Sequence, residues 1–212
     1  MEKIKKEVLL NYLEELHSDA KCALNYDNDY ELLISIMLSA QTTDKAVNKV
    51  TKVLFNKYPD IEALSNADIF DIESIIKELG LYKNKARNIL STAKKLKSDG
   101  YNHIPNDFDY LISLDGVGRK TANVFLAEFY NMNTLGVDTH ILRVSKRLGI
   151  SKENADALSA ELSIKEFITD YNYKDLHHML IAFGREECKA INPKCESCKL
   201  QIYCKHYSDS NN

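Results

Sequence analysis

A lysine at the start of a predicted helix is the residue of this 212-residue chain best placed for covalent chemistry. The letters LDGVG, from Leu114 to Gly118, predict a tight hairpin, and Lys120 falls in the first turn of the helix that follows. The helix dipole and the adjacent Arg119 both disfavour a charged amine there, so we expect the pKa of Lys120 to be lowered. Most lysines on helices are solvated surface residues, but a neutral amine in this position would be a usable nucleophile.

The two glycines of the hairpin indicate where a second molecule could approach. Gly116 and Gly118 allow a sharp turn and present no side chain that would block close contact. The helix that follows them begins with unpaired backbone N–H groups, which favour an anion such as a phosphate.

A carboxylate precedes the next predicted helix. Asp138 stands directly before Thr139 and His140, which is a standard position for a helix N-cap. A capping carboxylate accepts backbone N–H bonds and stays ionised. The same group can therefore cap the helix and stabilise a positive charge during a reaction.

Four cysteines near the end of the chain suggest a metal site. Cys188, Cys195, Cys198 and Cys204 follow the spacing C-x6-C-x2-C-x5-C. Four thiols in so short a segment favour metal binding over disulfides in an intracellular protein. Structural zinc and a [4Fe–4S] cluster both accept four thiolates, so the spacing alone leaves both open. The separate Cys22 is predicted to be a small buried hydrophobe.

The elements that must position these residues are all predicted to be helices. No strand-length alternation of apolar and polar residues occurs, and apolar residues recur at helical spacing. The expected helices cover 3–17, 30–39, 44–58, 60–66, 68–78, 83–99, 107–114, 119–131, 153–168 and 174–184, with one more from Thr139. We expect the polar tail after Cys204 to be frayed.

Composition and charge favour an intracellular protein. No apolar run is long enough to span a membrane, and the first residues lack the features of a signal peptide. The net charge is −3, but lysines and arginines cluster beside the motifs, in 83–97, 119–120, 143–147 and 185–205. Each run alone is typical of a solvated face; together they predict a basic groove on an otherwise acidic body. Binding of a polyanion in such a groove should weaken steeply with salt.

Two further positions lie at the ends of predicted helices. Gln41 follows an almost wholly apolar helix and precedes Thr42 and Thr43, whose side chains suit an N-cap. Gly80 is predicted to be a C-cap, and Leu81 after it would ordinarily be a core leucine.

Five stretches carry a resemblance to a known family. LDGVGRKTANVFL, GVDTHILRVSKRLG, LLISIMLSAQTTDKAVNKV, LGLYKNKARNI and the cysteine cluster resemble the endonuclease III family of DNA glycosylases, in that family's order and over nearly the whole chain. The resemblance implies an all-α, two-lobed helix-hairpin-helix glycosylase fold with a C-terminal iron–sulfur loop. It places a helical bundle in 22–132 and a cluster domain in 1–21 plus 133–212, with Lys120 and Asp138 on facing walls of the cleft between them.

The resemblance also implies an activity. The chain would be a bifunctional DNA glycosylase and abasic-site lyase that removes oxidised or ring-saturated pyrimidines. Lys120 would attack C1′ and form a Schiff base, and Asp138 would stabilise the cationic sugar; Ser39 and His140 would line the pocket for the base. The partner would be double-stranded DNA that contains damaged pyrimidines or abasic sites, bound by a monomer in the cytoplasm.

The remaining implied roles concern DNA contacts and the cofactor. Gln41 and Leu81 would enter the duplex from opposite sides, and apolar wedges of this kind kink DNA. The hairpin would bind the DNA backbone through Gly116, Gly118 and Arg119. The four cysteines would hold a structural [4Fe–4S] cluster, and the loop between the first two would contact the backbone.

Three alternatives fit the residues less well. An adenine glycosylase of the same superfamily would lack Lys120, would carry a glutamate where the helix before Gln41 offers only Ser35, and would have a further C-terminal domain. An 8-oxoguanine glycosylase would share the lysine but usually lacks the cysteines. A non-catalytic DNA-binding or redox-sensing module would bind duplex without turnover, and it would not need Lys120 and Asp138 together.

Overall fold

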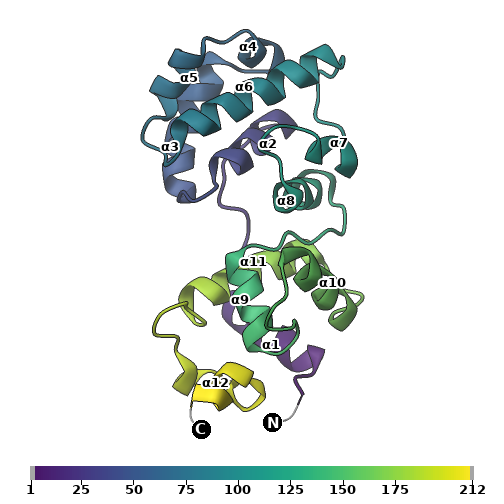
Figure 1. The fold of residues 1–212 in the computed structure, drawn as a ribbon. Helices are drawn as coiled ribbons and strands as arrows, with labels where there is room; N and C mark the ends of the chain where they lie inside the picture. Colours follow the sequence, from purple (N-terminus) through teal and green to yellow (C-terminus); the bar gives the residue numbers. More distant parts are fainter. Residues whose placement is uncertain (1–2, 211–212) are drawn as a thin grey trace. The chain divides into compact units, whose positions relative to one another are not determined.

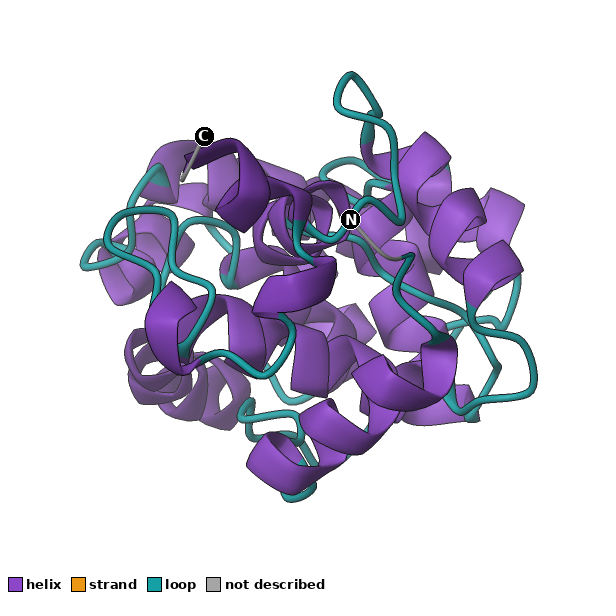
Figure 2. Ribbon diagram, turned by 90° about the horizontal axis from the view of Figure 1, so that it is seen from below, coloured by secondary structure: helices purple, strands orange, loops and turns teal. Residues whose placement is uncertain are grey.

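The structure, a computed structural model, describes residues 3–210, which form helices joined by loops without any strand (Figure 2). The predicted all-α fold is confirmed. The chain divides into two compact units: Ala23–Met132, and the residues up to Cys22 together with those from Asn133 onward. No helix among the described residues is both long and apolar enough to cross a membrane.

The unit Ala23–Met132 is built around one buried helix. Its elements are α2 (Asp29–Leu38), α3 (Asp44–Lys57), α4 (Ile61–Ser65), α5 (Ile69–Ile76), α6 (Tyr82–Ser98), α7 (Phe108–Ile112) and α8 (Arg119–Tyr130) (Figure 1). Every residue from Leu32 to Leu38 is buried, as its apolar sequence predicts. Helix α2 contacts α3, α6 and α8, while α4 and α5 pack on α6.

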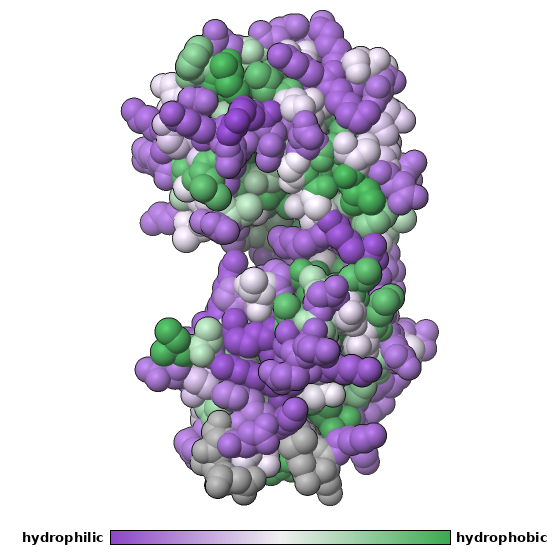
Figure 3. All heavy atoms as spheres, viewed as in Figure 1, coloured by the Kyte–Doolittle hydropathy of each residue, from purple (hydrophilic) through white to green (hydrophobic). Residues whose placement is uncertain are grey.

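The other unit combines one N-terminal helix with the C-terminal third of the chain. Its elements are α1 (Lys6–His17), α9 (Thr139–Arg147), α10 (Ala157–Phe167), α11 (Tyr173–Glu186), the short 3-10 helices η1 (Cys195–Ser197) and η2 (Gln201–Tyr203), and α12 (Lys205–Ser210) (Figure 1). Leu9 and Leu13 of α1 share a core with Ile141, Val144 and Phe183. With apolar residues buried in this way, polar residues make up most of the visible surface, and apolar ones form separate patches (Figure 3).

Side-chain caps begin most of these helices. Asn28, Thr43, Asp60, Asp68, Asp107, Asp138, Asp156 and Asn172 each accept a backbone N–H of the helix that follows. Such a cap stabilises a helix by about 1 kcal/mol. Helices α6 and α8 begin without one, at Leu81 and Gly118, so they lack this local source of stability.

Some sequence-based predictions of helix ends are wrong. Lys205–Ser210 of the tail that is predicted to be frayed form α12, because Tyr207 packs against the core and the Ser208 N–H donates to the Cys204 carbonyl. The last two residues of that tail lie outside the described part of the chain. The helix expected from residue 153 begins only at Ala157, because Asp156 accepts the Ser159 N–H and so fixes the start.

Candidate functional site

The glycine hairpin is anchored on α6. Leu114 and Val117 are buried beneath it. The Ser91 hydroxyl donates a 2.5 Å hydrogen bond to the Asp115 carboxylate, and the Thr92 hydroxyl donates one of 3.0 Å to the Asp115 carbonyl oxygen. These contacts fix the hairpin from both its apolar and its polar side.

The two glycines of the hairpin differ in what a side chain would meet. Gly116 has a φ of +79°, and a Cβ on it would lie 2.5 to 2.9 Å from side-chain atoms of Asn88. A side chain at this position would therefore be both strained and crowded. Gly118 has an ordinary φ of −88°, and a Cβ there would meet no atom within 4 Å. No neighbouring atom therefore requires a glycine at 118, and the space beside it is open.

Lys120 lies in the first turn of α8, as the sequence predicts. The helix begins at Arg119 without a side-chain cap, and Lys120 is half-buried. The Arg119 guanidinium lies over the Phe108 ring, 4.9 Å from its centroid. A cation that stacks on an aromatic face in this way links the start of α8 to the start of α7.

Gln41 and Leu81 share an unusual backbone conformation. Their φ angles are +54° and +58°, in the left-handed region, and both side chains are exposed. This conformation costs a residue other than glycine roughly 1–2 kcal/mol. Leu81 is not the core leucine that its local sequence alone would suggest, because 59% of its surface is exposed. The expectation for Gly80 also needs correction, because the left-handed residue is Leu81 and not the glycine before it.

The loops that carry these two residues touch each other. A Cβ on Gly80 would lie 4.0 Å from the carbonyl oxygen of Gln41. The Lys85 Nζ donates a 2.6 Å hydrogen bond to the Thr42 hydroxyl. Lys85 is buried, and this burial lowers the pKa of its ammonium group.

The burial of Lys85 is not what the sequence predicts, because this residue falls within a basic run that is typical of a solvated helix face. A signal was available: Lys85 shares its helical face with Ile89 and Leu96, which are also buried. Other charges of that run are neutralised by ion pairs, Lys95 with Asp99 and Lys97 with Glu62.

Asp138 is the N-cap of α9. Its carboxylate accepts the Ile141 N–H at 2.8 Å, which confirms the predicted capping role, and the side chain is half-buried. The connector before it is held by the His177 ring, whose Nδ1 lies 2.7 Å from the Gly136 carbonyl oxygen. A hydrogen bond from the Tyr173 N–H to the Asn133 side chain fixes the start of this connector.

Helix α9 lies unusually close to α11. A Cβ on Gly184 of α11 would come within 2.9 Å of the His140 Cβ. The Arg143 guanidinium donates a 2.7 Å hydrogen bond to the Gly184 carbonyl oxygen. The glycine therefore sets the distance between the helix that Asp138 caps and its neighbour.

The four C-terminal cysteines line one pocket, together with Arg147, Phe183 and Pro193 among others. None of them forms a disulfide. Burial raises the pKa of the Cys195, Cys198 and Cys204 thiols, and their mutual proximity raises it further. Within residues 3–210, no group of three or more His, Cys, Asp or Glu side chains is arranged so that it could hold a metal ion. The four cysteines nevertheless share one pocket, and four thiols are a donor set that suits a metal group with four thiolate ligands.

Arg143 and Arg147 hold the loop that starts at Cys188. Arg143 donates to the carbonyl oxygen of Cys188 at 3.1 Å, and Arg147 donates to that of Lys189 at 2.6 Å. These donors give both arginines a structural role in the cysteine loop, and the predicted basic groove stays a prediction. Both line a cavity of about 560 Å³ between α9 and α12, but their hydrogen bonds point to the backbone.

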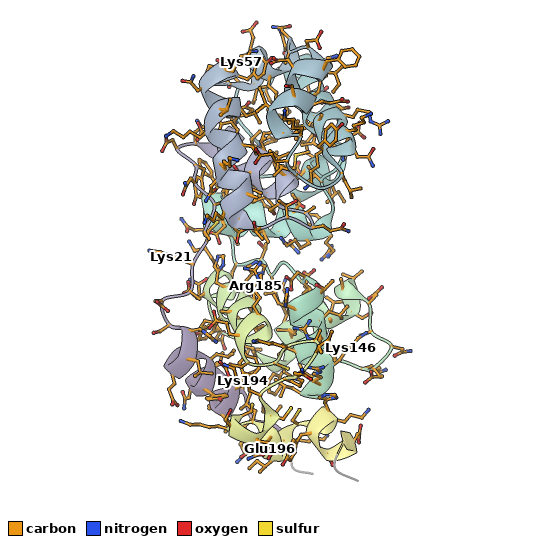
Figure 4. All side chains as sticks on the ribbon, turned by 90° about the vertical axis from the view of Figure 1, so that its left-hand side faces the viewer. Lys21, Lys57, Lys146, Arg185, Lys194 and Glu196 are labelled. Carbon is orange, nitrogen blue, oxygen red and sulfur yellow. The ribbon has the colours of Figure 1, made fainter. Side chains whose placement is uncertain are left out.

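The cations of this unit come from several elements. Lys146, Arg185 and Lys194 lie in α9, in α11 and in the loop after α11 (Figure 4). Lys194 forms a 2.9 Å ion pair with Glu187. Part of the basic character of the cysteine loop is therefore balanced within the loop.

Comparisons with known proteins agree with these features. Residues 34–169 match the family described as HhH-GPD superfamily base excision DNA repair protein. The chain is 40% identical to endonuclease III of Bacillus subtilis over 199 residues, which cover 94% of this chain and 91% of that protein. It is 36% identical to endonuclease III of Escherichia coli, over 97% of each chain. Among solved structures, a trapped covalent intermediate of an endonuclease III with DNA matches with a TM-score of 0.92 and 39% identity, over 99% of this chain and 100% of the other.

Proposed function

Since the chain belongs to the endonuclease III family of the HhH-GPD superfamily, we propose that it is a bifunctional DNA glycosylase and abasic-site lyase of base excision repair. Its substrates are oxidised or ring-saturated pyrimidines in double-stranded DNA, and abasic sites. The observation that carries this proposal is Lys120 itself. This half-buried lysine lies in the first turn of a helix without a side-chain cap, two residues after Gly118, beside which the space is open.

The proposed reaction begins with the Lys120 amine as the nucleophile. Its nitrogen forms a bond to C1′, the glycosidic bond breaks, and the bonding electrons leave with the base, which takes up a proton. The sugar ring opens to give an iminium ion. Loss of the C2′ proton then expels the 3′ phosphate by β-elimination, so the strand is cut on the 3′ side. Water hydrolyses the iminium and restores the lysine.

Asp138 is the proposed second catalytic residue. Its carboxylate accepts the Ile141 N–H, which holds the side chain at the start of α9. A carboxylate can stabilise the positive charge that develops on the sugar. It can also accept a proton from the lysine that must become neutral.

The proposed DNA contacts follow from exposure. The open space beside Gly118 would admit a phosphate to the first turn of α8, beside Gly116 and Arg119. The exposed Gln41 and Leu81 would fill the gap that remains when the damaged nucleotide leaves the stack. We propose that the protein acts as a monomer on the DNA of the cytoplasm.

The proposed cofactor is a [4Fe–4S] cluster held by Cys188, Cys195, Cys198 and Cys204, the cysteines that line one pocket. When bound, such a cluster would link the cysteine loop into one rigid segment and would do no chemistry on the substrate. We also propose that 22–132 and 1–21 plus 133–212 are the functional domains.

Borohydride trapping on a duplex with one thymine glycol tests the proposal. Wild-type protein should give a covalent adduct, and Lys120→Ala should give none. Lys52→Ala, which changes an exposed lysine of α3, is the matched control and should trap like wild type. Strand cleavage by wild type without an adduct would exclude the lysine mechanism. Binding without cleavage or trapping, on thymine glycol and on an abasic site, would favour a non-catalytic DNA-binding module.

A further inference from the structure

Lys85 is a buried lysine that the proposed chemistry does not use. Only 6% of its surface is exposed, and its Nζ donates a 2.6 Å hydrogen bond to the Thr42 hydroxyl. Within the described part of the chain, no carboxylate forms an ion pair with it. Burying an ammonium group without a counter-charge costs free energy of folding. A residue that opposes stability in this way is a candidate for a functional role.

Lys85 connects two segments that lie far apart in the sequence. Its backbone N–H donates to the carbonyl oxygen of Leu81 at 3.1 Å, and its side chain reaches Thr42. The Thr42 hydroxyl also donates to the Ala40 carbonyl oxygen at 3.3 Å, across the intervening Gln41. One lysine therefore touches the turn around Gln41 and the turn at Leu81.

Each of these two turns holds an exposed residue in the left-handed conformation, Gln41 in one and Leu81 in the other. A left-handed residue other than glycine persists only where its surroundings hold it. The loops also meet directly, since a Cβ on Gly80 would lie 4.0 Å from the Gln41 carbonyl oxygen. The hydrogen bond between Lys85 and Thr42 fastens them at this contact.

We propose that Lys85 is a positioning residue, which locks the Gln41 and Leu81 turns at a fixed spacing so that both side chains are ready to enter DNA. This inference rests on the proposed function. Because the two turns are already ordered in the folded protein, less conformational entropy is lost when their side chains enter the opened duplex. Lys85 touches neither the substrate nor the reacting atoms and acts only through these two turns.

Lys85→Met tests the proposal, because methionine keeps an unbranched side chain and removes the hydrogen bond and the charge. Single-turnover rates would be measured on a duplex with thymine glycol opposite adenine and on a duplex with an abasic site. We expect the first rate to fall about tenfold or more, because the base must leave the stack. The second should stay within about twofold of wild type, because no base has to be extracted. The melting temperature should be unchanged or raised, because an unpaired buried charge is removed.

Two further variants give the test its controls. Thr42→Val removes the acceptor and should reproduce the selective loss, and the double variant should be no slower than the slower single variant. Lys52→Met makes the same substitution at an exposed position of α3, and both of its rates should match wild type.

Three results would overturn the inference. Equal loss of both rates in Lys85→Met would indicate a general folding defect. Wild-type rates on both duplexes would show that the hydrogen bond positions nothing that the reaction needs. If wild-type protein fails on both duplexes, the proposed function falls and this inference falls with it. Normal wild-type excision with an unaffected Lys85→Met refutes the positioning role alone.

Discussion

At the scale of single residues, Asp138 has two tasks that can be separated. Its carboxylate caps α9 through the Ile141 N–H, and the proposed chemistry also needs its negative charge. Asparagine caps a helix about as well as aspartate but carries no charge. Substitution of Asp138 by asparagine therefore separates its capping role from the role of its negative charge.

Asp138→Asn should leave stability unchanged and reduce catalysis. We expect the free energy of unfolding to change by less than about 0.5 kcal/mol, because the cap is kept. The single-turnover excision rate should fall by about 100-fold or more, because the carboxylate proposed to stabilise the developing charge is lost. Urea unfolding and single-turnover kinetics would measure the two effects.

Asp138→Ala is the companion variant, which loses the cap and the charge together. It should be destabilised by about 1 kcal/mol and react no faster than Asp138→Asn. An Asp138→Asn protein that excises bases at the wild-type rate would limit Asp138 to its capping role.

Part of this residue-level picture could be predicted from sequence and part could not. The cap at Asp138 was predictable, because capping depends on a few adjacent residues. The exposure of Leu81 was not, because a leucine after a glycine carries no local sign that it will adopt a positive φ. The bonds of Arg143 and Arg147 to the cysteine loop depend on partners about 40 residues away, which no local pattern reveals.

At the scale of elements, α6 supports two of the turns that the proposed function uses. Leu81 is its N-cap residue, and the middle of the helix contacts the glycine hairpin through Asn88, Ser91 and Thr92. The rigidity of the hairpin therefore depends on its contact with this helix. That contact is tightest where Gly116 meets Asn88.

Gly116→Ala should destabilise the protein, and Gly118→Ala should not. The alanine at 116 would have a φ of +79° and a Cβ 2.5 Å from the Asn88 amide nitrogen, so we expect a loss of about 1–3 kcal/mol. The alanine at 118 meets no atom within 4 Å, so stability should change by less than about 0.5 kcal/mol. Its affinity for duplex DNA should fall, since its methyl group would occupy the proposed path of a phosphate.

Adding Asn88→Ala to Gly116→Ala separates the two causes of strain at this glycine. The double variant should recover the part of the stability that the contact costs and retain the part that the backbone conformation costs. Equal urea midpoints for Gly116→Ala and Gly118→Ala would show that the hairpin adapts to a side chain, against the rigid contact described here.

The helices themselves were largely predictable, because apolar spacing and caps are local. The buried sequence of α2 predicted a central helix, and α2 is central. Helix α12 was not predicted, because its sequence is polar and its order comes from Tyr207, which packs on a core built by distant residues. Where tertiary contacts decide, local propensity fails.

At the scale of the whole molecule, the described chain has two hydrophobic cores. One lies wholly within Ala23–Met132, and the other joins α1 with residues from Leu135 onward. The cysteine pocket adjoins only the second core, through Phe183. Stability that depends on the cysteines should therefore be confined to that unit.

Cys198→Ser should lower the bound iron and loosen only the unit that contains the cysteines. Serine is a poor replacement for a thiolate ligand, so we expect the iron content per chain to fall well below that of wild type. Hydrogen exchange should accelerate in η1, η2 and α12, and next in the last turn of α9, which Arg147 ties to the cysteine loop. Helices α4 and α5 belong to the other core and should keep their wild-type protection.

Cys22→Ser is the matched control, since Cys22 lies outside the pocket, and this variant should retain its iron and its protection from hydrogen exchange throughout. Equal loss of protection in α4 and α12 would show that the two cores unfold as one cooperative unit, and full retention of iron would remove Cys198 from the proposed ligands.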